Sequence, residues 1–202
     1  MEYKGDKGCD YKSHPPLDHS KSLNDFNDMG IPVFAPYLDR NIKPMDMGGF
    51  EVKFFALTTL DGRWTHTNAD GSECPCYGFL ITHKEMGRML YITDTELIKW
   101  KFKSINHILL GVNYDKDLID NEDSAKVNHV YRGHMSIDTA CDFVKANNSK
   151  DLQNVIMCHL SKNNADKDLF IDKMKSTVSN ADVDVAGPGK EWVLRKGDEC
   201  PF

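Results

Sequence analysis

Residues 77–95 read YGFLITHKEMGRMLYITDT, and this stretch decides the fold class. Two short apolar segments, YGFLIT and MLYIT, stand on either side of the polar turn HKEMGR, which is the pattern of a β-hairpin. The second segment leads directly into Asp94 and Thr95. Residues 77–82 and 89–93 are therefore predicted to form paired strands, with polar side chains at the end of the second strand.

Apolar segments and helical patterns alternate along the rest of the chain. Helices are predicted where apolar residues recur at helical spacing, and buried strands where a short apolar run is bounded by polar residues. The predicted strands cover residues 31–35, 50–58, 108–112, 155–158 and 183–186, and the predicted helices cover residues 18–29, 136–146 and 166–178. A central hairpin followed by alternating strands and helices predicts an α/β protein with a mixed sheet.

The composition is that of a globular domain. The chain has 202 residues, of which 40% are apolar and 28% charged, and 25 Lys and Arg against 31 Asp and Glu give a net charge of −6. Mean hydropathy is −0.51, and no apolar run approaches the ~20 residues of a membrane-spanning helix. The N-terminus lacks the apolar segment of a signal peptide, so we expect a cytoplasmic protein without a membrane partner. Its six cysteines are expected to be reduced structural thiols.

Polar residues follow three of the predicted strands. Asp94 follows MLYIT, Asn113-Tyr114-Asp115 follows ILLGV, and His159 follows VIMC. Because ligands of open α/β sheets bind beyond the carboxyl ends of strands, we expect these three ends to face one cleft. Imidazoles and carboxylates that converge there suit Zn²⁺ or a similar divalent ion. Singly, a turn-forming Asp or a surface His explains each residue as well, so spacing alone leaves both interpretations open.

Several longer motifs occur in an order that resembles metallo-β-lactamase-fold hydrolases. These motifs are DHSKSL at 18–23, TDT at 93–95, NYD at 113–115, GHMS at 133–136, CHLSKNN at 158–164 and VAGPGKEWVL at 185–194. The sequence looks most like the YycJ-type cytoplasmic phosphodiesterases and exonucleases, which also occur in phages, and the resemblance covers residues 13–194. It implies an αββα sandwich with mixed sheets and, for a phage-encoded protein, a place in the host cytoplasm.

The resemblance also implies a set of metal ligands. The family binds two ions through a His-x-His-x-Asp-His run, a middle His, a bridging Asp and a final His. The matching residues are His14, Asp18, His19, His66, Asp94 and His159. Pro16 stands where the family has the second histidine of the run, so one site is complete and the other lacks a ligand. We expect one tight ion, Zn²⁺ or alternatively Mn²⁺, and a second ion that is weaker or absent.

Catalytic roles follow from the same resemblance. The residues it assigns to the catalytic centre are Asp94, His134 and Asp18. Asp94 is expected to bridge the metals and orient the attacking hydroxide, while His134 holds a phosphate oxygen or protonates the leaving group. A residue at a helix entry, beside Ser136, is the structural alternative for His134. The other histidines match no family position and are predicted to be surface residues: His83, His107 and His129.

The implied activity is phosphodiester hydrolysis by a metal-activated water. The substrate is either single-stranded nucleic acid or a small cyclic nucleotide. Residues 99–103, KWKFK, offer lysines with aromatic rings for base stacking, although a solvated lysine face is the commoner explanation of such a stretch. Pro16 supports an alternative function, that of a weakened or inactive relative that binds a ligand or a protein.

The N-terminal region is shorter than the resemblance leads one to expect. In the family several strands precede the histidine run, whereas here residues 1–13 form a polar lead before a single domain at residues 14–202. We therefore expect the fold to lack its first strands. A homodimer is the expected means of covering the sheet edge that their loss exposes.

Overall fold

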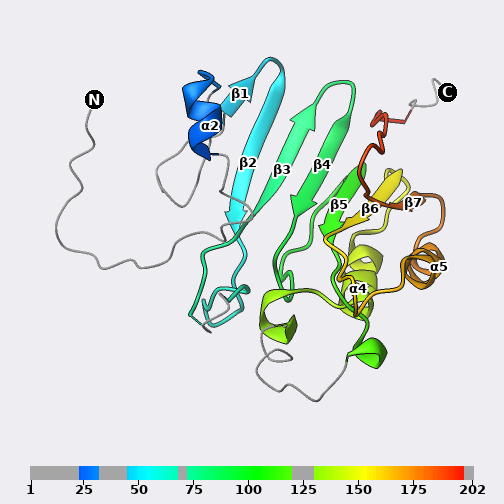
Figure 1. Ribbon diagram of the computed structural model, residues 1–202. Helices are drawn as coiled ribbons and strands as arrows, with labels where there is room; N and C mark the ends of the chain where they lie inside the picture. The colour runs from blue at the N-terminus through cyan, green and yellow to red at the C-terminus, as the bar shows by residue number, and fades with distance from the viewer. Residues whose placement is uncertain (1–22, 32–44, 68–71, 120–129, 198–202) are drawn as a thin grey trace.

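The computed structural model describes residues 23–31, 45–67, 72–119 and 130–197, which contain a seven-stranded mixed sheet with helices packed against it (Figure 1). The strands are β1 (Met45–Met47), β2 (Phe50–Ala56), β3 (Tyr77–His83), β4 (Gly87–Ile92), β5 (His107–Gly111), β6 (Asn154–Cys158) and β7 (Asp182–Val185). The helices are α2 (Leu23–Asp28), α4 (Ile137–Asn147) and α5 (Lys167–Thr177), with a short 3₁₀ helix, η1 (Lys116–Leu118).

The strands lie in the sheet in the same order as in the sequence. Neighbours from β1 to β4 are antiparallel, and neighbours from β4 to β7 are parallel. Gly87 opens β4 with φ at 81°, a left-handed conformation that lets the chain reverse tightly after β3. The parallel half of the sheet brings the carboxyl ends of β4, β5 and β6 to one edge.

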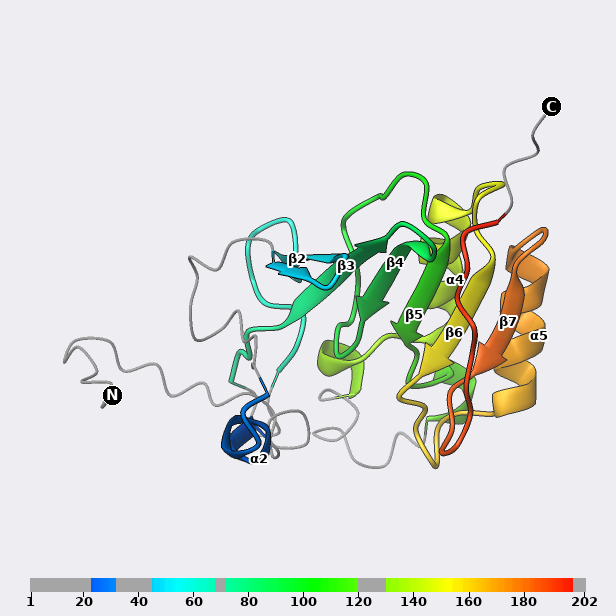
Figure 2. The same cartoon turned by 90° about the horizontal axis from the view of Figure 1, so that it is seen from above.

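The apolar core lies between the sheet and the two helices α4 and α5, which Figure 2 shows behind the parallel strands. Leu90 and Ile92 of β4 and Leu110 of β5 are fully buried on this face of the sheet. Phe170 and Met174 stand one turn apart on α5 and are also fully buried. The helices thus fix the position of the parallel strands, and with them the position of the loops at the strand ends.

Both core helices begin at a side-chain cap. The Ser136 hydroxyl accepts a hydrogen bond from the N–H of Thr139 at 3.2 Å, and the Asp166 carboxylate accepts from two N–H groups in the first turn of α5. These caps pair backbone donors that the start of a helix leaves without partners. They agree with the predicted helix starts at residues 136 and 166.

The predicted elements are confirmed wherever the structure describes them, apart from small shifts of their ends, and so is the α/β class with a mixed sheet. The prediction for residues 18–29 is described only from Leu23 onward. Residues 32–35 of the predicted strand 31–35 lie outside the described residues, and Ile31 belongs to no strand. An αββα sandwich needs a second sheet, whereas the described residues form the one sheet above. In the described ranges no helix is long and apolar enough to cross a bilayer.

Candidate metal centre

Three residues from predicted strand ends lie together at one edge of the sheet. Asp94 comes just after β4, Asn113 just after β5, and His159 directly after β6. The side-chain amide of Asn113 donates to the carbonyl oxygen of His159 at 2.8 Å. Oδ1 of Asp94 lies 3.4 Å from Nδ1 of His159. The three strand ends therefore lie together, as the sequence predicts, while the cleft that they are expected to face stays a prediction.

Asp94 and His159 both have a left-handed backbone, with φ at 48° and 62°. For a residue other than glycine this conformation costs on the order of 1 kcal/mol. Such strain persists only where the surrounding structure enforces it, and strained positions cluster at functional sites. Of the three described residues other than glycine with positive φ, which are Asp94, Ser104 and His159, two lie at this site with their side chains 3.4 Å apart, which points to a shared role.

His66 reaches the same point from the loop between β2 and β3. Its side chain is buried, and Nδ1 lies 2.8 Å from the carbonyl oxygen of Gly133. Because a carbonyl oxygen can only accept, Nδ1 of the neutral imidazole carries the proton and Nε2 keeps the lone pair. Histidines that bind metals are typically oriented in this way, by a hydrogen bond from the other ring nitrogen to a backbone carbonyl.

Candidate ligand atoms of His66, Asp94 and His134 all lie within 4.8 Å of one another. Oδ1 of Asp94 is 3.4 Å from Nδ1 of His134, the same separation as from Nδ1 of His159. The His134 ring lies next to both other imidazoles, with centroids 5.6 Å from His66 and 5.1 Å from His159. Two ligands bound at about 2.0–2.1 Å to a tetrahedral zinc ion stand about 3.3–3.4 Å apart. The Asp94–imidazole separations therefore fit ligands of one divalent ion.

Two thiols near this cluster, Cys76 and Cys158, have raised pKa values. Burial is the main cause that raises the pKa of Cys76 to about 12 and that of Cys158 to about 11, and the negative charge of Asp94 raises both further. A cysteine binds metal or attacks an electrophile as the thiolate. In the part of the chain that the structure describes, the group of candidate ligand atoms within 4.8 Å of one another contains imidazoles and a carboxylate and no thiol, a donor set suited to Zn²⁺ or Mn²⁺.

No protein-family model matches this sequence, and no curated protein is significantly similar to it. The chemistry of the cluster therefore carries the functional assignment.

The structure describes four of the residues that the sequence assigns to the site, and it brings all four together: His66, Asp94, His134 and His159. His134 was expected to act on the phosphate or the leaving group. Its Nδ1 lies 3.4 Å from Oδ1 of Asp94, a separation that two ligands of one ion also have. His14, Asp18 and His19 lie outside the described residues, as does Pro16, so their metal-binding roles stay predictions.

The prediction of a surface position is wrong for His107. Its side chain is 1% exposed at the start of β5, and its ring nitrogens lie 2.9 Å from the carbonyl oxygen of Met86 and 2.8 Å from the side-chain oxygen of Asn154. Burial lowers its pKa, so it is a neutral residue of the interior. His83 is half-buried and stacks on Phe50 with ring centroids 4.4 Å apart, and His129 lies outside the described residues.

Gly133 is a site residue that the sequence motif GHMS contains but that spacing did not single out. A Cβ atom at this position would stand 3.2 Å from Nδ1 of His66. Its carbonyl fixes the tautomer of His66, and its lack of a side chain lets that ring approach. The signal in the sequence was the glycine directly before His134.

Proposed function

We propose that this chain is a divalent-metal-dependent hydrolase of phosphodiester bonds with the metallo-β-lactamase fold that its motifs resemble. The observation that carries the proposal is the meeting of Asp94 with three histidines at the carboxyl ends of the parallel strands. Ligand loops at that end of a mixed sheet agree with this fold and with the usual place of ligands in α/β proteins.

Among the described residues, His66 and Asp94 each provide a ligand atom for the ion in this proposal. His66 binds through Nε2, because its Nδ1 donates to Gly133. Asp94 would bind the same ion through its carboxylate, since one of its oxygens lies 3.4 Å from the Nδ1 atoms of two imidazoles, those of His134 and His159. In this proposal the N-terminal ligands complete the set, and Pro16 leaves the second ion weak or absent. The N-terminal ligands are His14, Asp18 and His19.

A divalent ion in this position supplies Lewis-acid chemistry, which acidifies water and neutralises charge on a phosphate oxygen. Asp94 accepts a hydrogen bond from the attacking water and orients it for in-line attack. His134 keeps 14% of its side chain exposed beside Asp94, so it can contact a phosphate oxygen or give a proton to the leaving oxygen.

The lysine and aromatic stretch 99–103 contributes less to nucleic-acid binding than its sequence suggests. Nζ of Lys99 donates to the turn at residues 58–59, at 2.7 and 2.9 Å. Phe102 packs against two other phenylalanine rings, with centroids 5.1 and 6.5 Å away. Trp100 remains 47% exposed. Together with the net charge of −6, this favours a cyclic nucleotide or a short single-stranded end as the substrate.

Metal content and hydrolysis, measured on the same preparation, test the proposal. We expect bound zinc or manganese after loading, and cleavage of cyclic mononucleotides or short single-stranded DNA that a chelator abolishes. Asp94→Asn should lower activity by more than about 100-fold, because it removes a charged ligand. Asp172→Asn, an exposed position on α5, is the matched control and should leave both readouts unchanged. A loaded protein without a bound divalent ion contradicts the proposal.

Pro16 favours a second candidate, a ligand-binding protein that retains the scaffold without turnover. Pro16→His separates the two functions. A large rise in phosphodiester cleavage supports the hydrolase, because it restores the imidazole that the resemblance implies. Bound metal with no cleavage of either substrate, in the parent and in Pro16→His alike, favours the binding protein.

A further inference from the structure

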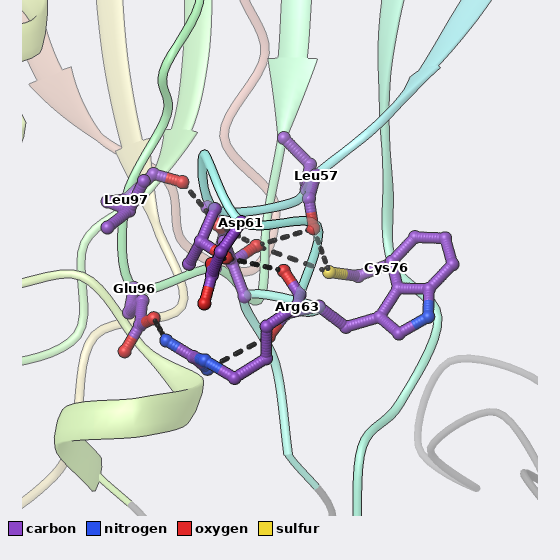
Figure 3. Close-up of polar contacts among 10 residues, drawn as sticks. Leu57, Asp61, Arg63, Cys76, Glu96 and Leu97 are labelled. Atoms are coloured by element: carbon purple, nitrogen blue, oxygen red, sulfur yellow. Dashed lines mark hydrogen bonds and ion pairs between the residues drawn. The ribbon is translucent and has the colours of Figure 1, made fainter.

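Two loops that carry candidate ligands are joined by a buried pair of hydroxyl groups. Thr65 directly precedes His66, and Thr95 directly follows Asp94. The Thr95 hydroxyl donates to the Thr65 hydroxyl at 2.6 Å, and the two side chains are 1% and 0% exposed. Figure 3 shows the polar network around this contact, with Leu57, Arg63 and Cys76 on one side and Glu96 and Leu97 on the other. The pair therefore links the backbone of one candidate ligand to that of the other.

Each hydroxyl is also anchored to backbone. The Thr65 hydroxyl lies 2.9 Å from the carbonyl oxygen of Leu57, and the Thr95 hydroxyl lies 2.7 Å from that of Leu97. A threonine has one hydroxyl proton and two acceptor sites, so the pair shares its protons between the mutual contact and the two carbonyls. Two protons can make only two of these three hydrogen bonds at once, and each hydroxyl lies within hydrogen-bond distance of the other and of one carbonyl oxygen.

Backbone hydrogen bonds also join the segment around Thr65 to the segment around Thr95. The N–H of Glu96 donates to the carbonyl oxygen of Thr65 at 2.9 Å, and the N–H of Thr65 donates to that of Leu57 at 3.1 Å. Arg63 forms an ion pair with Glu96 at the outer end of the network. Asp94 is the strained, left-handed residue of this segment, and strain of that kind persists only when neighbouring contacts enforce it.

We infer that Thr65 and Thr95 are positioning residues, whose hydroxyl pair sets the spacing between the ligand atoms of His66 and Asp94. The inference rests on the proposed metal-dependent function. Metal ligands have to stand within about ±0.2 Å of their ideal distances, so a contact one residue away from each ligand controls affinity directly. Neither threonine touches the ion or the substrate in this proposal.

Valine substitutions test the role of the hydroxyls, because valine keeps the shape of threonine and removes only the polar group. Thr65→Val and Thr95→Val should each weaken zinc binding roughly 10–100-fold, the usual cost of losing a partner that orients a ligand. Thr65→Ser and Thr95→Ser keep the hydroxyl and should bind zinc almost as tightly as the parent. Thr177→Val is the matched control, since its hydroxyl lies in α5 and donates to Lys173.

Zinc affinity is measured by competition with a chromophoric chelator, and the ligand field by the visible absorption of the cobalt-substituted protein. A changed cobalt spectrum in the valine variants, but not in the serine variants or in Thr177→Val, supports the positioning role. A merely structural role would lower the stability of the metal-free protein and leave the cobalt spectrum as in the parent, and that result overturns the inference. Should a valine variant not fold, Thr95→Ala takes its place under the same criteria.

Failure of the proposed function gives a different result. A parent protein that binds no divalent ion refutes the metal centre itself. The crystal structures of the metal-free parent and of Thr95→Val then decide the inference by the distance between the His66 and Asp94 ligand atoms. An increased distance in the variant supports the positioning role, and an unchanged distance overturns it.

Discussion

Replacing Gly133 with alanine is expected to weaken metal binding without weakening the fold. A Cβ atom at position 133 would stand 3.2 Å from Nδ1 and 3.4 Å from Cε1 of His66. The imidazole then has to move by roughly 0.2 Å, which is the whole tolerance of a metal ligand. The movement also stretches the 2.8 Å hydrogen bond that orients the ring. Since complete loss of such a contact costs roughly 10–100-fold in affinity, we expect the zinc Kd to rise about tenfold.

Stability separates this effect from general damage. Gly133 has no positive φ and ends the helical residues 130–133, so alanine should leave the free energy of unfolding unchanged or raise it by up to about 1 kcal/mol. Gly187→Ala is the control, because nothing lies within 4 Å of a Cβ atom there. Chelator competition measures the Kd, and urea unfolding of the metal-free protein measures stability. An unchanged Kd in Gly133→Ala, or an equal loss of affinity in Gly187→Ala, would refute the reasoning.

Three further predictions concern the framework around the site. Lys173 donates to the buried Asp115 carboxylate at 2.9 Å; burial raises the pKa of Asp115, but a backbone N–H and Lys173 outweigh it and leave the pKa below its ordinary value. Lys173→Met should cost roughly 1–2 kcal/mol of unfolding free energy, a modest amount because a third of the lysine side chain is exposed. The loss should shrink as the pH falls through the lowered pKa of Asp115, because the protonated carboxyl no longer pairs with the lysine. A loss that does not depend on pH contradicts this. Burial raises the pKa of Cys158 to about 11, so iodoacetamide at about pH 8 should label it far more slowly in the native than in the unfolded protein, and equal rates contradict the assignment. Phe170→Ala should cost about 3–5 kcal/mol in urea unfolding, because the ring is fully buried, whereas Leu169→Ala, at an exposed neighbour, should cost far less; similar costs would place the core elsewhere.

Much of the fold could be predicted from the sequence because local and tertiary preferences agree. The segments that became β3, β4, β5 and β6 are short, rich in apolar residues and bounded by polar turns. β1 was not predicted, since Asp46 between two methionines carries no β-branched or aromatic signal, and the strand exists through its pairing with β2. The error at His107 has the same origin. A polar residue at the start of a strand gives no sign that neighbouring segments will bury it.

The site could be predicted in part, because strand ends are visible in the sequence and meet at one edge when strands are parallel. Asp94 and His159 were found in this way, and the resemblance added His66 and His134. The close approach of His66 to Gly133 could not be predicted, because the two residues are far apart in the chain and meet only through tertiary packing. The buried contact between Thr65 and Thr95 joins segments that no local pattern connects.

Anomalous diffraction at the zinc edge, from crystals of the zinc-loaded protein, tests the central claim most directly. The structure predicts a strong peak about 2.0–2.2 Å from Nε2 of His66 and from a carboxylate oxygen of Asp94, with His134 or His159 as a further ligand. A zinc peak bound only elsewhere, or loaded crystals with no peak between His66 and Asp94, would contradict a metal centre at the carboxyl ends of these strands.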